Sequence, residues 1–174
     1  VLRVTKPGTE DEKRIPVADG DTIEFVASPA KIAIPPGGRK QVRMVSLGDP
    51  GEEKVYRINF TPVLPPLEET ETEGIGVRIV VAYQVLALIH PAQPVESLVV
   101  KRDPISISFN NTGNSYVLIS NVRQCNKNGE NCQDDLGSKR LYAGNKTTIA
   151  LPYTDTPVTY RMTNFKGARE ETVK

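Results

Sequence analysis

The sequence predicts an all-β protein built from two small sandwiches. Three observations carry this prediction: short runs of alternating apolar and polar residues, turn signals at short intervals between them, and no helical 3.6-residue period across the 174 residues. Successive side chains of a strand point to opposite faces of a sheet, so such runs are typical of half-buried strands. We therefore expect antiparallel strands joined by loops rich in glycine and proline.

The first group of expected strands ends at Pro91. These strands fall at residues 1–5, 22–26, 41–45, 55–60 and 75–91. The polar run at residues 9–14 is expected to be a loop or a hairpin tip.

A second group of strands follows a stiff linker. Pro91 and Pro94 end the preceding strand and restrict the chain after it, which predicts a first domain at 1–91 and a second at 92–174. Strands of the second domain are expected at residues 98–101, 105–110, 116–122, 139–142, 147–151 and 158–164.

The segment at residues 75–91 is the longest expected strand. Ile75, Val77, Ile79 and Val81 fall on one of its faces, because side chains repeat every two residues. Residues 85–89 are apolar on both faces, which predicts burial between two layers. The apolar row from Ile75 to Val81 needs a cover, and the pattern leaves open whether the protein supplies it.

The composition disfavours several classes of protein. The net charge is +1, from 22 basic and 21 acidic residues, and the basic residues are scattered, so we expect no nucleic-acid partner. No segment has the roughly 18 to 20 apolar residues of a membrane helix, so we expect no membrane insertion. No signal peptide is recognisable at Val1, and we expect that processing removed any such segment or that it lies outside this sequence.

Catalytic patterns are weak. His90 is the only histidine and lies beside the linker, which favours a hinge or surface residue over a general base. No serine has the context of a nucleophile elbow, and no glycine-rich loop lies between a strand and a helix. The acidic run at residues 68–73 lacks the spacing of a calcium loop and is expected to be a solvated loop. We predict no enzymatic activity, no cofactor and no metal.

Two cysteines, Cys125 and Cys132, bracket the sequence Asn-Lys-Asn-Gly-Glu-Asn. This spacing does not match a zinc site, which uses closer pairs and four ligands. Asparagine and glycine favour a tight turn, so we predict a local disulfide in an oxidising compartment. Two free thiols in a reducing compartment are the alternative.

The order of several short motifs resembles a known family, the PapD-like periplasmic fimbrial chaperones. The motifs of their N-terminal domain are, in order, Ser28-Pro29, Pro36-Gly37, Gln41-Val42-Arg43, Tyr56-Arg57-Ile58, a proline-bearing loop and the long strand ending at Pro91. Residues 108–118 are similar to the opening of their C-terminal domain. The cysteine pair and the tail look most like the alternate chaperones of the colonisation-factor and common-pilus type.

The resemblance implies a fold and a function. It implies two immunoglobulin-like domains in an L or boomerang arrangement, in a periplasmic chaperone that binds fimbrial subunits by donor-strand complementation. The donor residues would be Ile75, Val77, Ile79 and Val81. The chaperone would pass its subunit to an outer-membrane usher, and a self-capping homodimer in the free state stays open.

Two departures from the family pattern affect these expectations. The first strands of the N-terminal domain would precede Val1, so the first sandwich is expected to lack them. The family's lysine on the long strand falls near Leu86, so Arg78 or Arg57 would have to anchor the C-terminus of the subunit.

Two other functions are open. An immunoglobulin-like structural or adhesive fimbrial subunit would share the fold, but its donor segment belongs at the N-terminus and not in the middle of the chain. A carbohydrate-binding or hydrolytic sandwich is disfavoured, because tryptophan is absent and aromatic residues make up 6% of the chain.

Overall fold

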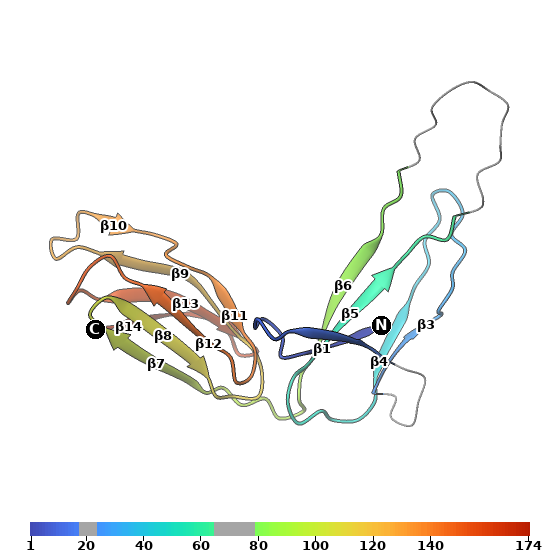
Figure 1. The fold of residues 1–174 in the computed structure, drawn as a ribbon, viewed down its shortest axis with the longest axis horizontal. Coiled ribbons are helices and arrows are strands. Elements are labelled where there is room, and N and C mark those ends of the chain that lie inside the picture. Colours follow the sequence, from blue (N-terminus) through green and yellow to red (C-terminus); the bar gives the residue numbers. More distant parts are fainter. Residues whose placement is uncertain (18–23, 65–78) are drawn as a thin grey trace, which may run out of the picture.

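β-Strands make up all the regular secondary structure in residues 1–17, 24–64 and 79–174, the ranges that the computed structural model describes, and no helix occurs in these ranges. Figure 1 shows two groups of strands that meet at an angle, which we call the first arm (β1 to β6) and the second arm (β7 to β14). The expected all-β, two-sandwich fold is confirmed.

The first arm contains two antiparallel sheets. Its strands are β1 (Leu2–Thr5), β2 (Lys13–Pro16), β3 (Phe25–Ser28), β4 (Arg43–Ser46), β5 (Lys54–Phe60) and β6 (Tyr83–Ile89). One sheet has the order β2-β1-β5-β6, and β3 pairs with β4 in the other. Phe25 stacks on Tyr56, with ring centroids 4.6 Å apart, and both pack with Ile58 between the sheets. This aromatic contact joins the two layers.

A polar cluster also links the two sheets of the first arm. The carboxylate of Glu24, just before β3, accepts hydrogen bonds from Lys54 Nζ at 2.6 Å and Tyr56 Oη at 3.3 Å. Arg3 Nη1 on β1 lies 3.4 Å from the same carboxylate. The hydrogen bond from Lys54 is the main cause that lowers the pKa of Glu24.

The second arm is the larger sandwich. Its strands are β7 (Leu98–Asp103), β8 (Ser106–Asn111), β9 (Val117–Cys125), β10 (Cys132–Gln133), β11 (Lys139–Leu141), β12 (Lys146–Ala150), β13 (Val158–Asn164) and β14 (Gly167–Val173). One sheet has the order β12-β8-β7; the other has the order β10-β9-β13-β14, with β11 also paired to β9. The buried core residues are Ile107, Phe109, Val117, Ile119, Val122, Leu141, Leu151, Val158, Tyr160 and Met162. Alternate residues of β8 and β13 supply half of them, as the period of two requires. β9 supplies three more, and its alternation shifts by one residue between Ile119 and Val122, where its pairing with β13 is irregular.

Most expected strands occur within a few residues of their predicted positions, but four differences stand out. β2 begins at Lys13, inside the run at residues 9–14 that was expected to be a loop or a hairpin tip, and β10 and β14 were not expected. Within the described part of the long strand expected at 75–91, pairing covers only β6, because β5 ends at Phe60, the partner of Tyr83. Residues 79–82 have no strand assignment, and residues 75–78 lie outside the described ranges, as do residues 22 and 23 of another expected strand.

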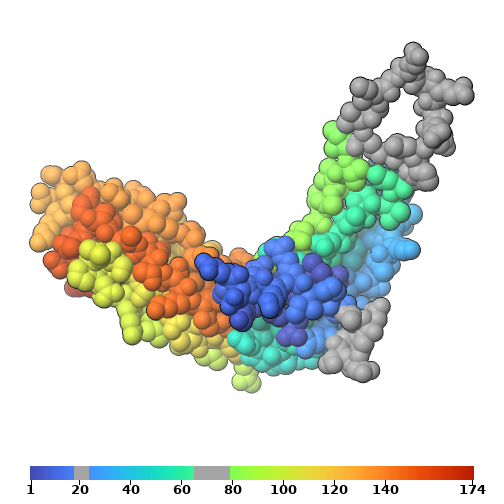
Figure 2. Space-filling view, viewed as in Figure 1, coloured from blue at the N-terminus to red at the C-terminus, as the bar shows by residue number. Residues whose placement is uncertain are grey.

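Each sheet of the described residues lies wholly on one side of residues 90–97. The domain boundary at Pro91 stays a prediction. Figure 2 shows an open concave side between the arms, with the β1–β2 hairpin lying against the second arm at its base. There, Asn145 Nδ2 donates a hydrogen bond to the carbonyl oxygen of Pro7 at 2.7 Å.

Candidate functional site

β6 is an edge strand of the first arm. In the described residues it pairs with β5 alone, from Lys54–Ile89 at one end to Phe60–Tyr83 at the other. Its second edge therefore presents backbone N–H and C=O groups that a further strand can pair with. Figure 1 shows β6 on the side of the first arm that faces the second arm across the open angle.

One face of β6 passes from the interior of the arm to the solvent. Ala87 and Ile89 pack against the core of the first arm. The residues of the same parity nearer the start of the strand become exposed: Val85 by 41%, Tyr83 by 68%, Val81 by 54% and Ile79 by 85%. We call Ile79, Val81, Tyr83 and Val85 the apolar row. The row continues the protein's own core into a region where its own chain supplies no cover among the described residues.

The structure places only part of the predicted donor row. Ile79 and Val81 are exposed as an unfilled donor row requires, whereas Ile75, Val77 and Arg78 lie outside the described residues. Tyr83, two residues after Val81 on the same face, is a further member of the row that the sequence analysis did not name. The alternation that relates Val81 to Tyr83 could have identified it.

The expected burial of both faces at residues 85–89 is wrong at its beginning. Val85 is 41% exposed and Leu86 is 40% exposed, on opposite faces of β6. The reason is that no second layer covers this end of the strand in the described residues.

The other face of β6 is polar near its start. Arg57 Nη1 donates to Gln84 Oε1 at 2.8 Å, and Gln84 Nε2 donates to Asn59 Oδ1 at 2.7 Å. Arg57 Nη2 also lies 3.8 Å from Glu12 Oε1. The pKa of Glu12 is lowered, first by a hydrogen bond from the backbone N–H of Gly8 and further by the nearby arginines.

Arg57 is the one of the two candidate anchors for a partner's carboxylate that lies within the described residues, and these contacts engage its side chain. Its side chain is 28% exposed, and its Nε finds no hydrogen-bond partner among the described residues. Leu86, where the resemblance expects a lysine, is the register partner of Arg57. An incoming carboxylate would compete with Gln84 for the guanidinium group.

A cleft of about 640 Å³ lies between the arms. Its walls come from β1 and the turn after it, from the loop before β5, and from residues 142–145 of the second arm. Glu53 contributes to the wall, with a side chain that is only 1% exposed. The cleft is thus a joint surface of both arms.

Known proteins share this arrangement of strands. No family model matches the sequence. The solved structure of the class 5 fimbriae chaperone CfaA superimposes with a TM-score of 0.71 at 21% identity, over 99% of this chain and 82% of that chain. A solved chaperone–tip adhesin complex of CFA/I fimbriae biogenesis gives a TM-score of 0.68 at 22% identity, over 98% of this chain and 81% of that chain.

This chain has the fold of a class 5 fimbrial chaperone. The expected PapD-like architecture is confirmed at the level of the fold.

Two curated proteins of Escherichia coli are similar in sequence to this chain. One, named as a CS1 fimbrial subunit, is 27% identical over 150 residues, which is 82% of this chain and 63% of that protein. The other, named as a CFA/I fimbrial subunit, is 26% identical over 149 residues, which is 80% of this chain and 61% of that protein. The chain thus spans less than two thirds of the length of these relatives.

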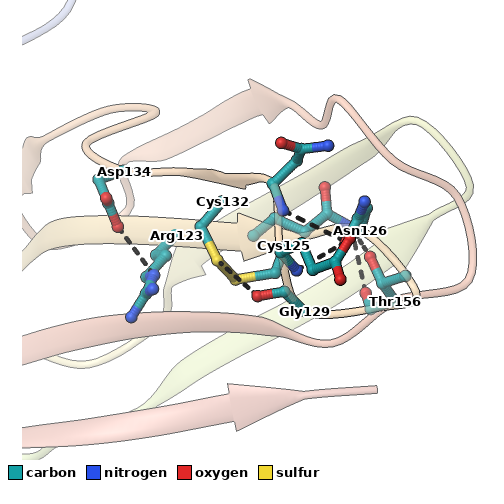
Figure 3. Close-up of a disulfide and its surroundings, with 10 residues drawn as sticks. Arg123, Cys125, Asn126, Gly129, Cys132, Asp134 and Thr156 are labelled. Carbon is teal, nitrogen blue, oxygen red and sulfur yellow. Dashed lines mark hydrogen bonds and ion pairs between the residues drawn. A yellow bond between two sulfur atoms is a disulfide. The ribbon is translucent and has the colours of Figure 1, made fainter.

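The chaperone fold carries the predicted disulfide at the far end of its second arm. Cys125 and Cys132 are bonded across β9 and β10, with Cα atoms 3.9 Å apart. Figure 3 shows the turn between them, in which Asn126 Oδ1 accepts hydrogen bonds from the N–H groups of Glu130 at 3.1 Å and Asn131 at 3.4 Å. The alternative of two free thiols is not the state seen in the structure.

His90 lies at the joint of the fold, not in a catalytic arrangement. Its Nδ1 is 2.8 Å from Glu53 Oε2 and 3.0 Å from Ser115 Oγ. A base that activates a serine uses one ring nitrogen for the serine and the other for its carboxylate, whereas here one nitrogen meets both. The geometry is that of a structural contact between the arms.

Residues 1–17, 24–64 and 79–174 contain no group of three His, Cys, Asp or Glu side chains arranged to hold a metal ion. The acidic run at residues 68–73 lies outside the described residues. Over the described part of the chain, no helix has the length and apolar character needed to cross a membrane.

Proposed function

We propose that this protein is a non-enzymatic periplasmic chaperone that binds fimbrial subunits by donating β6 and the residues just before it. The observation that carries the proposal is the apolar row, which continues the protein's own core along β6, a strand whose outer edge has no partner among the described residues. A subunit that lacks one strand of its sandwich would pair with the edge and cover the row. The chaperone named in the structural comparison has the same fold over nearly the whole chain.

The row supplies enough apolar surface to stabilise such a complex. Burying a large aliphatic or aromatic side chain contributes about 1.5 to 3 kcal/mol, so Ile79, Val81 and Tyr83 together contribute up to about 4.5 to 9 kcal/mol before the cost of ordering the segment. Backbone hydrogen bonds along the edge add register and orientation. We propose Ile75 and Val77 as further members of the donor segment.

The remaining partners of the family belong to the same proposal. Delivery of the subunit to an outer-membrane usher would follow capture, and the disulfide suits the oxidising periplasm. When no subunit is present, a second copy would cover the apolar row and form a self-capping homodimer. Arg57, or Arg78, would anchor the C-terminal carboxylate of the subunit, with Arg57 exchanging Gln84 for that carboxylate.

Co-purification tests the proposal. A fimbrial subunit is co-expressed in the periplasm with the tagged protein, and Ile79→Asp is expected to abolish its recovery while the variant stays folded. Ile105→Asp is the matched control, because Ile105 is 68% exposed on the second arm and outside the row. Equal recovery of the subunit with Ile79→Asp and with the parent protein would overturn the proposal.

A structural or adhesive fimbrial subunit is the second candidate, because both curated relatives carry the words fimbrial subunit in their names. A subunit would assemble into polymers through its own donor segment. Light scattering of the purified protein separates the two functions: growth of long polymers favours the subunit, and a monomer or a closed dimer favours the chaperone.

A further inference from the structure

Three loops meet where the two arms join. They are the loop before β5 (residues 49–53), the linker (residues 90–97) and the turn after β8 (residues 112–116). Pro91 and Pro94 restrict the linker but leave its other backbone bonds free to rotate, so the angle between the arms also depends on the contacts between these loops.

Asn114, in the turn after β8, bonds to both of the other loops. Its Nδ2 donates to the carbonyl oxygen of Gly51 at 3.0 Å and to that of Gln93 at 3.1 Å. Its Oδ1 accepts from the N–H of Val95 at 2.6 Å, and its backbone carbonyl accepts from the N–H of Glu53 at 2.8 Å. A single side chain and its backbone thus connect the first arm, the linker and the second arm.

Gly113, the residue before Asn114, lets this turn approach the linker closely. A Cβ atom on Gly113 would lie 2.2 Å from the carbonyl oxygen of Val95 and 2.9 Å from the nitrogen of Ser97, distances that no side chain can occupy. The backbone N–H of Gly113 donates to the carbonyl oxygen of Ser97 at 3.1 Å. The close approach therefore requires glycine and brings Asn114 within reach of both partners.

Other contacts cross the same joint. Asp49 Oδ1 accepts from the N–H of Ala92 at 3.0 Å and from that of Gly51 at 3.1 Å, which ties the first arm to the linker. The buried carboxylate of Glu53 accepts from Ser115 Oγ at 3.0 Å and lies 2.8 Å from His90 Nδ1. Asn114 stands at the centre of these contacts, because it alone in this set bonds to Gly51, to the linker and to Glu53.

We propose that Asn114 is the positioning residue that sets the angle between the arms. It fixes the loop before β5, and β5 carries β6, so the direction of the apolar row relative to the second arm follows from it. The angle is a property of the free protein, so this inference goes beyond the proposed function and does not require it.

Distance measurements between spin labels on the two arms test the proposal in the intact chain. Arg43→Cys on β4 and Lys101→Cys on β7 are exposed attachment points, with the native disulfide left oxidised. Asn114→Asp keeps an acceptor for the N–H of Val95 but loses the donor to Gly51, and it places a carboxylate beside two carbonyl oxygens. The distance distribution is expected to shift and broaden. Asn128→Asp, in an exposed turn at the far end of the second arm, is the matched control and is expected to leave it unchanged.

A folded Asn114→Asp variant with the parent distribution would overturn the proposal. Asn114→Ser is the second variant, because serine suits a turn but is too short to reach Gly51. Hydrogen exchange in the parent protein needs no variant: the Glu53 amide, whose acceptor is the Asn114 carbonyl, is expected to exchange as slowly as core amides of β5. Fast exchange there contradicts the proposal. None of these measurements uses a fimbrial subunit, so their outcome is separate from that of the capture experiment.

Discussion

Tyr83, the first residue of β6, is paired in register with Phe60, the last residue of β5. Before this pair, the chain that leads into β6 has no ladder partner in the described residues, and Val81 and Ile79 are exposed. The apolar row therefore begins within the paired strand, at Val85 and Tyr83, and continues beyond the end of the ladder to Val81 and Ile79, where it is open to another molecule.

Neighbouring residues of β6 should differ in their effect on subunit binding, because they lie on opposite faces. Tyr83→Ala removes a 68% exposed ring from the apolar row, and we expect about a tenfold loss of affinity, which corresponds to about 1.4 kcal/mol. Gln84→Ala, on the polar face, removes no apolar cover and releases Arg57 from its present partner, so the affinity is expected to stay the same or to rise. Titration of a fluorescent subunit measures both, and equal losses would argue against pairing through one face.

The stacked pair in the first arm is expected to control the stability of that arm alone. Phe25 is 3% exposed and stacks on Tyr56, so Phe25→Ala should cost about 3 to 5 kcal/mol. The two methionines, Met44 on β4 and Met162 in the core of the second arm, report on the arms separately by NMR of labelled methyl groups. In the Phe25→Ala variant, the Met44 signal should lose its native chemical shift at a lower temperature than in the parent protein. The Met162 signal should lose it at the same temperature as in the parent.

Val26→Ala provides the comparison for this substitution. Val26 is the next residue of β3 but points outward, with 37% exposure, so its loss should cost less than about 1 kcal/mol. If both variants melt alike, the layer contact between Phe25 and Tyr56 does not hold the first arm together.

The carboxylate of Glu96 is expected to make the second arm sensitive to acid. Hydrogen bonds from Arg169 and from Asn164 Nδ2 at 2.8 Å, with Lys166 Nζ at 3.5 Å, lower the pKa of Glu96 from 4.5 to about 2. A carboxyl group whose pKa is lower in the folded protein than in the unfolded chain stabilises the fold at pH values above the unfolded pKa. This stabilisation is lost as the pH falls from 4.5 through about 2.

Urea denaturation of Glu96→Gln at several pH values measures this contribution. At neutral pH the variant should be less stable by about 1 to 2 kcal/mol, a modest value because solvent screens the partly exposed Arg169. The difference from the parent should shrink as the pH approaches 2. Glu170→Gln, an exposed residue of β14, is the control, and a difference that stays constant down to acid pH would contradict the expectation.

The disulfide is expected to stabilise the fold by lowering the conformational entropy of the unfolded chain. Cys125 and Cys132 are separated by seven positions, and closing so short a loop stabilises a protein by about 2 kcal/mol in the chain-entropy model. The double variant Cys125→Ser, Cys132→Ser should unfold at lower urea concentration than the parent. Reductant should bring the parent to the same midpoint and leave the double variant unchanged; a shift of the double variant would point to another cause.

Local patterns in the sequence predicted the strands whose own residues alternate. β5 and β13 alternate clearly and were found at their predicted positions. β14 was missed, because the sequence Gly-Ala-Arg-Glu-Glu-Thr-Val has little apolar content and forms a strand through its pairing with β13. Among the described residues of the expected long strand, 79–82 have no strand assignment, because the pairing of β6 with β5 ends at Tyr83 and Phe60 and the sequence pattern of β6 alone does not show where its partner ends.

The candidate site divides in the same way. Alternation predicted that Ile79 and Val81 share one face and left open whether the protein covers them; both are exposed. The contact of Arg57 with Gln84 depends on the register between β5 and β6, and the bonds of Asn114 depend on how two distant loops meet, so neither is encoded in a local pattern. Such long-range relationships become visible only in three dimensions.

The charged sequence of β14 affects where the protein can begin to aggregate. Its outer rim carries arginine and glutamate side chains, which repel the in-register stacking of strands that leads to fibrils. β6, by contrast, has the sequence Tyr-Gln-Val-Leu-Ala-Leu-Ile, which contains no charged side chain. Aggregation on heating or during storage should therefore nucleate at the first arm, and solubility can be improved there without altering the second.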